Sequence, residues 1–376
     1  MKIALFGGTF DPPHTEHAQL LITAQKELTP DILYVVPAGI PPHKIRKVSP
    51  SPMRKEMAQL LADAVPGATV YDGELKREGK SYTLLTLREI REKHPEAEIY
   101  LLMGADMLLD FPTWYYPKEI LSLAKVCVCL RGDEIENGAR AKAFFKKRFK
   151  TECMVLPFHG KAVSSTLLRC KAAIGLNYDK DTLPNVSTYL KQHNLYRKPW
   201  TERLETALSP HRKEHTLGVM LTALSAAKRL GVDEEATFTA AALHDVAKAY
   251  PDAFADKIPS QVPGPVKHQY AGAELAKNDL GITDEDVLNA IRYHTSARGG
   301  MSTLEKLIYV ADMIEPSRDY PCVNKLRKLF YKNFDQCFIA CLSHTVKHLK
   351  AKKKDIYPLT EDALRYYKKR RKKNEF

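Results

Sequence analysis

Hydrophobic and polar positions change their spacing about halfway along the chain. In the first half, short apolar runs alternate with amphipathic stretches of helical period. Because apolar runs of this length between helices are typical of buried strands, we predict a doubly wound, parallel α/β sheet with its ligand site at the carboxyl ends of the strands. The predicted strands are Ile3–Phe6, Ile32–Val36, Thr69–Tyr71, Ile99–Met103, Val126–Leu130 and Met154–Leu156.

The strand pattern stops near the segment Leu195–Trp200. Beyond it, apolar residues recur at helical spacing from Leu204 to Ala227 and again from Glu234 to Ala249. The proline- and glycine-rich stretch Ile258–Pro265 reads as a loop between helices. We therefore predict two domains, an α/β domain over residues 1–197 and an all-α domain over residues 198–376.

Composition narrows the class of protein. Hydrophobic residues make up 44% and charged residues 27% of the sequence, which is typical of a globular protein. No apolar run approaches the roughly 20 residues of a membrane span, and the N-terminus lacks a signal-peptide pattern. The seven cysteines include no Cys-x-x-Cys pair. We expect a protein of the reducing cytoplasm with no membrane partner.

The net charge of +13 is concentrated towards the C-terminus. Basic runs occur at Lys352–Lys354 and Lys368–Lys373, without interleaved aromatic residues. We expect a solvated helix end here and no nucleic-acid partner; RNA binding through the basic tail is the alternative. A basic protein also suits polyphosphate substrates.

The most informative motif directly follows the first predicted strand. A glycine turn between a strand and a helix brings backbone N–H groups close to an anion. His14 and His17 then share one face at the N-terminus of the helix, where they can meet a developing negative charge. The motif predicts a nucleotide bound by its phosphates. The candidate positions are Gly7, Gly8, Thr9, Phe10, His14 and His17.

Later stretches add polar groups at the expected strand ends. Lys44 follows the second strand and offers a cation on a proline turn. Gly104 and Asp106 follow the fourth strand, where a carboxylate can accept hydrogen bonds from ribose hydroxyls. Hydroxyls and N–H groups that open a late helix suit the β- and γ-phosphates of ATP. That helix carries Ser164, Ser165, Thr166 and, one turn further, Arg169.

Together these pieces resemble bacterial nicotinate-mononucleotide adenylyltransferases, in the nucleotidylyltransferase superfamily, over residues 1–197. The resemblance implies a Rossmann-like domain. It also implies that ATP, with Mg²⁺, and nicotinate mononucleotide react to give deamido-NAD and pyrophosphate. The segments that carry it are the opening motif, Pro42-His43-Lys44, Ser81-Tyr82-Thr83, Gly104-Ala105-Asp106, Trp114-Tyr115, Ser164-Ser165-Thr166 with Arg169, and Leu195-Tyr196-Arg197.

The resemblance also implies individual roles. The catalytic groups at the ATP phosphates would be His14, His17, Lys44 and Arg169. Trp114 would stack on the pyridine ring, and backbone N–H groups near Thr83 and Tyr115 would hold the nicotinate carboxylate. Because these carboxylate contacts come from the backbone, nicotinamide mononucleotide stays open as the acceptor. One position departs from the family: Glu16 replaces a glycine, and we expect its bulk and charge to affect ATP binding.

Six potential metal ligands lie on apolar helical stripes in the second half. His294, for example, continues the stripe of Val287, Ala290 and Ile291. Buried carboxylates without a partner cost several kcal/mol, and a metal centre satisfies all six residues at once. The ligand types suit iron or manganese, and their number favours two metals with Asp245 as the bridge. The six are His215, His244, Asp245, His268, His294 and Asp312.

The segments Tyr293–Thr295 and Ala311–Arg318 resemble the bacterial symmetrical diadenosine-tetraphosphate hydrolases of the HD phosphohydrolase superfamily. The resemblance covers about residues 200–370 and implies hydrolysis of diadenosine tetraphosphate to two ADP at a di-iron centre. Lys248 and Arg318 are candidates for holding phosphate oxygens, and Ala297 stands where that family has glycine. Two alternatives stay open, a nucleotide-sensing regulatory domain and a hydrolase of guanosine alarmones. The sequence also leaves the oligomeric state open, a homo-oligomer included.

Overall fold

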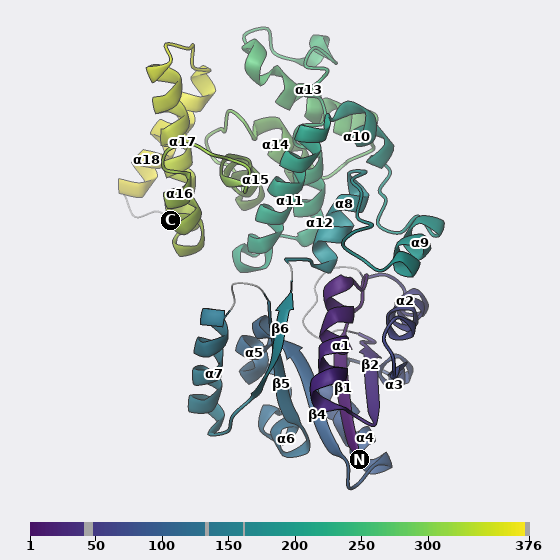
Figure 1. Ribbon diagram of the computed structural model, residues 1–376. Helices are drawn as coiled ribbons and strands as arrows, with labels where there is room; N and C mark the ends of the chain where they lie inside the picture. Colours follow the sequence, from purple (N-terminus) through teal and green to yellow (C-terminus); the bar gives the residue numbers. More distant parts are fainter. Residues whose placement is uncertain (41–47, 132–134, 161, 373–376) are drawn as a thin grey trace. The chain divides into compact units, whose positions relative to one another are not determined.

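The computed structural model describes residues 1–40, 48–131, 135–160 and 162–372. The chain forms two compact units (Figure 1). The first comprises Met1–Arg169 and Asn177–Leu195, and the second comprises Cys170–Leu176 and Tyr196–Phe376. The boundary after residue 197 stays a prediction.

The first unit is built on a six-stranded sheet in the order β3-β2-β1-β4-β5-β6, and all neighbouring strands are parallel. This confirms the predicted doubly wound sheet and its six strands. The strand order reverses between β1 and β4, and ligands of open parallel sheets bind at such a switch point. The strands are β1 Lys2–Gly8, β2 Ile32–Pro37, β3 Ala68–Val70, β4 Glu98–Gly104, β5 Lys125–Arg131 and β6 Met154–Gly160.

Helices cover both faces of this sheet (Figure 1). Alternate residues of β1 enter two separate cores: Leu5 packs with α4 and α7 residues, and Phe6 packs with α1 and α2 residues. Strands buried on both faces read as continuous apolar runs, which is why they stood out in the sequence. The helices up to residue 195 are α1 Thr15–Leu28, α2 Ser51–Asp63, α3 Gly73–Lys76, α4 Thr83–Lys93, α5 Ala105–Asp110, the 3₁₀ turn η1 Phe111–Thr113, α6 Pro117–Leu123, α7 Ile135–Phe149, α8 Ser165–Ala173 and α9 Pro184–Gln192. The part of α8 from Cys170 onward belongs to the second unit.

The second unit is helical throughout the part of the chain that the structure describes, as predicted. None of its described helices, nor any in the first unit, is long and apolar enough to cross a bilayer. Its elements are α10 Thr201–Ala207, α11 Pro210–Leu230, α12 Glu234–Leu243, the 3₁₀ turn η3 Ala255–Lys257, α13 Gly264–Asn278, α14 Glu285–Tyr293, α15 Thr303–Ile314, α16 Val323–Lys332, α17 Phe334–Ala351 and α18 Pro358–Lys372.

Local capping residues set the helix ends in this unit. The predicted helical stretch Leu204–Ala227 is divided between two helices, because Ser209 caps a new helix by accepting a hydrogen bond from the Arg212 N–H. The helix expected to reach Ala249 ends at Leu243, and turns follow. Ser302 and Glu305 form a capping box at the start of α15.

Candidate functional site

His14 and His17 lie together where the loop after β1 enters α1. His14 is the N-cap residue, and its ring stacks on that of His17 with centroids 3.6 Å apart and planes 20° apart. The His17 Nδ1 accepts a hydrogen bond of 3.2 Å from the His14 N–H. A neutral His17 therefore carries its proton on Nε2, as a donor for an anion. The expected common face at the positive end of the helix is present.

The start of α8 holds this loop from the other side. The Arg169 guanidinium donates to the Asp11 carbonyl at 2.8 Å and to Thr166 Oγ1 at 3.0 Å. Ser165 Oγ donates to the Pro12 carbonyl at 2.8 Å, and Ser164 Oγ accepts from the Leu167 N–H at 3.1 Å. The structure therefore brings the predicted α8 residues beside the opening motif, where they position its backbone.

A buried arginine that we did not predict ties two strand ends together. Arg54 on α2 is 1% exposed and donates to the carbonyls of Thr9 and Ala38 and, at 2.8 Å, of Gly39. It therefore fixes the loops after β1 and β2. The sequence carried a signal, because Arg54 lies on the same helical face as the buried Met57 and Leu61.

A cavity of about 220 Å³ opens between β1 and the start of α4. It lies between the glycine turn after β1 and the segments Ser81–Thr83 and Trp114–Tyr115, which resemble an acceptor site. The Tyr82 and Tyr115 rings stack at one wall with centroids 4.5 Å apart. Lys44 lies outside the described residues, and so does the Asp106 side chain. The predicted residues that line the cavity are Gly7, Gly8, Thr9, Ser81, Tyr82, Thr83, Trp114 and Tyr115.

Glu74 also lines this cavity and was missed. Its buried carboxylate accepts a hydrogen bond of 2.7 Å from Thr86 Oγ1, and burial raises its pKa above the usual range. Ser81 Oγ accepts from the Gly39 N–H at 2.8 Å. A Cβ on Gly39 would lie 2.3 Å from the Glu74 carbonyl oxygen, so only glycine fits beside this wall. The sequence offers no periodic signal for Glu74, because α3 is a single turn.

Glu16 is buried on the inner side of α1, at 6% exposure. Its Oε2 lies 2.3 Å from the place that a Cβ on Gly160, the last residue of β6, would occupy. A glycine at the end of β6 thus leaves room for the glutamate of α1. The side chain is directed towards β6, which the sequence alone did not reveal.

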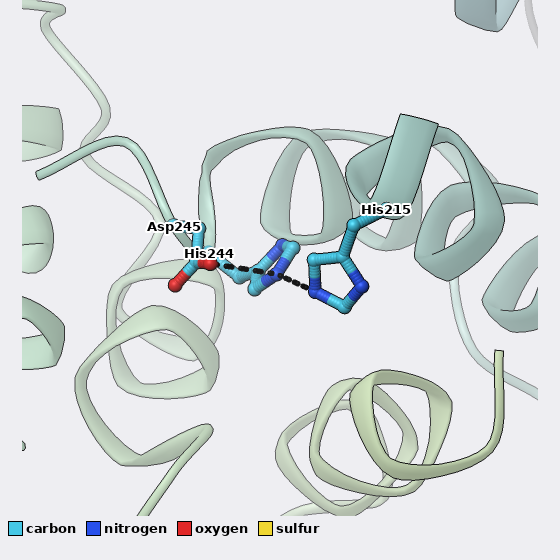
Figure 2. A group of neighbouring side chains, drawn as sticks. All are labelled: His215, His244 and Asp245. Carbon is cyan, nitrogen blue, oxygen red and sulfur yellow. Dashed lines mark hydrogen bonds and ion pairs between the residues drawn. The ribbon is translucent and has the colours of Figure 1, made fainter. Parts of the chain in front are cut away.

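In the second unit, five helices bring the six predicted metal ligands to one centre. His215 comes from α11, His244 and Asp245 follow α12, His268 comes from α13, His294 ends α14 and Asp312 comes from α15. Figure 2 shows His215, His244 and Asp245 turned towards one another. All but Asp312 are buried.

The ligand atoms form two groups that share Asp245. In each group they lie within 4.8 Å of one another, the first with His215 and His244 and the second with His268 and His294. The Nε2 atoms of the first histidine pair are 3.3 Å apart and those of the second pair 3.2 Å apart. Asp312 Oδ1 joins the first group, 3.0 Å from His215 Nε2. Such a donor set fits two metal ions with a bridging carboxylate.

The outer nitrogens of the histidines fix their ring orientations. His244 Nδ1 lies 2.7 Å from the Ala241 carbonyl, and His294 Nδ1 lies 2.8 Å from the Ile291 carbonyl. His215 Nδ1 lies 3.0 Å from a carboxylate oxygen of Glu315, which we did not predict. Each Nε2 is therefore the atom offered to the centre.

The pKa shifts of most of these groups favour the protonation states that bind metals, which are neutral histidine and ionised aspartate. Burial lowers the pKa of His244 to about 4 and that of His268 to about 3, so both rings are neutral at pH 7. Burial would raise the pKa of Asp245, but its hydrogen bond with His294 and nearby positive charges hold it well below its usual range. His215 differs, because burial is outweighed by its hydrogen bonds to Asp312 and Glu315, which raise its pKa to about 9.

A cavity of about 480 Å³ with several cationic side chains adjoins the centre. The predicted Lys248 and Arg318 line it: Lys248 Nζ lies 2.9 Å from His268 Nε2, and Arg318 donates to Asp312 Oδ1 at 2.5 Å. Arg212, which we missed, donates to Asp245 Oδ2 at 3.0 Å. Its spacing of three from His215 places both residues on one face of α11, and this was the available signal.

Ala297, the other departure noted in the sequence, adopts a positive φ of 59°. Glycine takes this left-handed conformation without the steric cost that a Cβ adds, which is the physical reason to expect glycine at this position. Ala297 is fully buried and lies three residues after His294.

Two family models match the chain. A model described as cytidylyltransferase-like matches residues 5–171, and one described as the HD domain matches residues 212–317. The fold and the sites thus define a nucleotidyltransferase-type α/β unit followed by a helical HD unit.

Curated relatives narrow both classes. A probable nicotinate-nucleotide adenylyltransferase of Albidiferax ferrireducens is 40% identical over 52% of this chain and 98% of its own length. A symmetrical bis(5'-nucleosyl)-tetraphosphatase of Bacillus subtilis is 41% identical over 41% of this chain and 87% of its own. By these matches the chain belongs to the nicotinate-nucleotide adenylyltransferase family in its first half and to the symmetrical bis(5'-nucleosyl)-tetraphosphatase family in its second.

Some relatives are named for both activities. A probable nicotinate-nucleotide adenylyltransferase/Ap4A hydrolase of Mycoplasma pneumoniae is 29% identical over 84% of this chain and 88% of its own length. The order of the two units therefore matches the order in the name of the Mycoplasma pneumoniae protein.

Proposed function

We propose that the chain is a bifunctional enzyme. One unit transfers the adenylyl group of ATP to nicotinate mononucleotide, giving deamido-NAD and pyrophosphate, and the other hydrolyses diadenosine tetraphosphate to two ADP. The observation that carries this proposal is that one chain holds both sites, in the order named for the Mycoplasma pneumoniae relative. We place the enzyme in the cytoplasm, because no disulfide joins the cysteines of the described residues.

In the transfer reaction, a phosphate oxygen of the mononucleotide attacks the α-phosphorus of ATP in line, and pyrophosphate leaves. No covalent enzyme intermediate is needed, so catalysis consists of positioning and charge stabilisation. The His17 Nε2–H and the N-terminus of α1 meet the charge that develops on the phosphates. Arg169 orders the loop through the Asp11 carbonyl, and Mg²⁺ enters with ATP.

The acceptor is assigned to the cavity of about 220 Å³ in the first unit. Trp114 offers an aromatic face for the pyridine ring, and backbone N–H groups near Thr83 and Tyr115 suit the nicotinate carboxylate. Nicotinamide mononucleotide is the alternative acceptor, since these donors also fit an amide oxygen.

The second reaction is assigned to the shared-carboxylate centre. His215, His244 and Asp312 would hold one metal, His268 and His294 the other, and Asp245 would bridge them. Metals held there, iron or manganese, would supply water activation and neutralise phosphate charge. Lys248, Arg318 and Arg212 bind phosphate oxygens along the adjoining cavity, because they are the lysine and arginine side chains that line it.

A substrate panel on the purified full-length chain tests both assignments. ATP with either pyridine mononucleotide is assayed for dinucleotide, and diadenosine tetraphosphate is assayed for ADP, with Mg²⁺, Mn²⁺ or Fe²⁺. Dinucleotide from nicotinate mononucleotide and ADP as sole hydrolysis product are expected. No dinucleotide with either acceptor would refute the first assignment. No ADP with any metal would favour the regulatory alternative, and faster cleavage of guanosine tetraphosphate would favour the alarmone hydrolase.

A further inference from the structure

Glu315 lies directly behind one metal-ligand candidate. Its side chain is 1% exposed, and its Oε1 lies 3.0 Å from His215 Nδ1, on the side of the ring that faces away from the centre. The opposite nitrogen, Nε2, lies 3.3 Å from His244 Nε2 and 3.0 Å from Asp312 Oδ1. The two contacts together determine which nitrogen of His215 faces the proposed metal.

The carboxylate is fixed by the turn that follows α15. Ser317 donates its N–H to Oε2 at 2.7 Å and its hydroxyl to Oε1 at 2.5 Å. Arg327 fixes the backbone of this turn, because its guanidinium donates to the carbonyls of Ile314 and Glu315 at 2.9 and 2.7 Å. Glu315 is thus anchored through both its side chain and its backbone.

The neighbouring helix leaves room for this carboxylate only because residue 218 is glycine. A Cβ on Gly218 of α11 would lie 2.5 Å from Glu315 Oε2. Gly218 and His215 lie one turn apart on α11, so the same helix supplies both the ligand and the space behind it. This arrangement costs helix propensity at a mid-helix glycine, which indicates that the contact matters.

The other three histidines are supported differently. His244 Nδ1 is within hydrogen-bond distance of the Ala241 carbonyl, and His294 Nδ1 of the Ile291 carbonyl. The Nδ1 of His268 lies 3.5 Å from Lys248 Nζ. Among the described residues, His215 is therefore the one ligand histidine whose Nδ1 contacts a carboxylate.

We propose that Glu315 is a positioning residue that sets the affinity of one metal position, the one formed with His215, and leaves the other position unchanged. A carboxylate that accepts the Nδ1–H makes Nε2 a more basic ligand and fixes the ring, and loss of such a partner costs metal affinity. The two halves of the centre then differ in affinity although they share Asp245. This inference rests on the metal centre proposed above and not on the identity of the substrate.

Mn²⁺ titration of the metal-free full-length chain tests the inference. Calorimetry should resolve two equivalents in the wild type. In Glu315→Gln, one equivalent should bind about 10- to 100-fold more weakly and the other should not change. Ser317→Ala, which removes one hydrogen bond to the carboxylate, should shift the same equivalent by less. Asp319→Asn is the matched control, because Asp319 lines the same cavity and its loss removes one negative charge.

The outcomes separate this inference from the function itself. Equal weakening of both equivalents, or no weakening of either, would overturn the role of Glu315 while leaving the metal centre standing. A wild type that binds no Mn²⁺ would overturn the centre and this inference with it. Circular dichroism checks that each variant is folded. If Glu315→Gln does not fold, Ser317→Ala decides by the same criterion.

Discussion

The two units place charge in opposite ways. In the first, the candidate site consists mostly of backbone groups and uncharged side chains at strand ends, and its buried carboxylate Glu74 has a raised pKa. In the second, the site consists of ionisable side chains, and the carboxylates Asp245 and Asp312 have lowered pKa values. All three carboxylates are at least partly removed from water, which alone raises the pKa.

The difference lies in the neighbours of each carboxylate. Glu74 is partnered chiefly by hydroxyls, which stabilise its charge less than burial penalises it. Asp245 Oδ1 lies 3.5 Å from His294 Nε2 and 3.5 Å from Lys248 Nζ, and these neighbours lower its pKa more than burial raises it. Charge therefore enters the first site mainly with the bound substrate. The second site keeps ionised carboxylates of its own.

The largest expected effect concerns Asp245, which belongs to both ligand groups. Asp245→Asn should reduce diadenosine tetraphosphate hydrolysis to the background rate, because an amide bridges two metals poorly. Adenylyl transfer, measured as dinucleotide formed, should stay at the wild-type rate. Metal content measured by mass spectrometry should fall in parallel with hydrolysis.

Asp252→Asn is the control for that experiment. Asp252 is exposed and pairs with Lys267 on the surface of the same unit. It should leave both activities unchanged. Retained hydrolysis in Asp245→Asn would refute the shared-carboxylate centre, and lost transfer would show that the two activities depend on each other.

The converse experiment concerns His17. His17→Ala removes the donor at the start of α1 and should lower kcat for adenylyl transfer by roughly 10²- to 10³-fold. Hydrolysis should not change. His193→Ala, an exposed histidine at the end of α9, is the matched control. A transfer rate within a factor of two of the wild type would remove His17 from the mechanism.

The sequence predicted the features that depend on periodicity. Six strands and the helical second half followed from apolar spacing, and the six candidate ligands stood out as polar residues on apolar helical stripes. Arg212 and Arg54 carried a helical signal of the same kind that we did not use. Glu315 follows the last residue of α15, where spacing says nothing about burial. Glu74 lies on a single helical turn, so its burial depends on tertiary packing.

Glu16 shows the limit of reasoning from one position. If the bulk and charge of Glu16 obstruct ATP, Glu16→Gly should tighten ATP binding. Its position against Gly160 predicts instead that ATP binding is not tightened, because the side chain is buried towards β6. Measuring the KM for ATP separates the two expectations.

A double-mutant cycle tests the same contact. Gly160→Ala should lower the free energy of unfolding by about 1–3 kcal/mol, because the new Cβ overlaps Glu16. In the Glu16→Gly background the loss should shrink, with a coupling of about 0.5–3 kcal/mol, although overlap with the Phe158 ring remains. Chemical denaturation of the four proteins gives the coupling. Additive effects would show that Glu16 and Gly160 do not constrain each other.

The smallest expected effect tests the charge comparison directly. The folded protein raises the pKa of Glu74 above its ordinary value of 4.5, so it keeps a proton where the unfolded chain has lost one. Stability therefore falls as pH rises through the folded pKa. Glu74→Gln cannot ionise and should stabilise the first unit at pH 8, with no gain at pH 4.

Asp245→Asn should do the opposite in the second unit. The pKa of Asp245 is lowered on folding, so its stabilisation is present above the ordinary value of 3.8 and is lost as pH falls. With a chelator present, hydrogen exchange of β1 and α12 peptides at pH 8 reports the two units separately. Both substitutions remove a carboxylate that can ionise. Glu74→Gln should slow hydrogen exchange in the first unit, whereas Asp245→Asn should speed it in the second. Changes of equal sign would mean that the two units do not differ in how they hold buried charge.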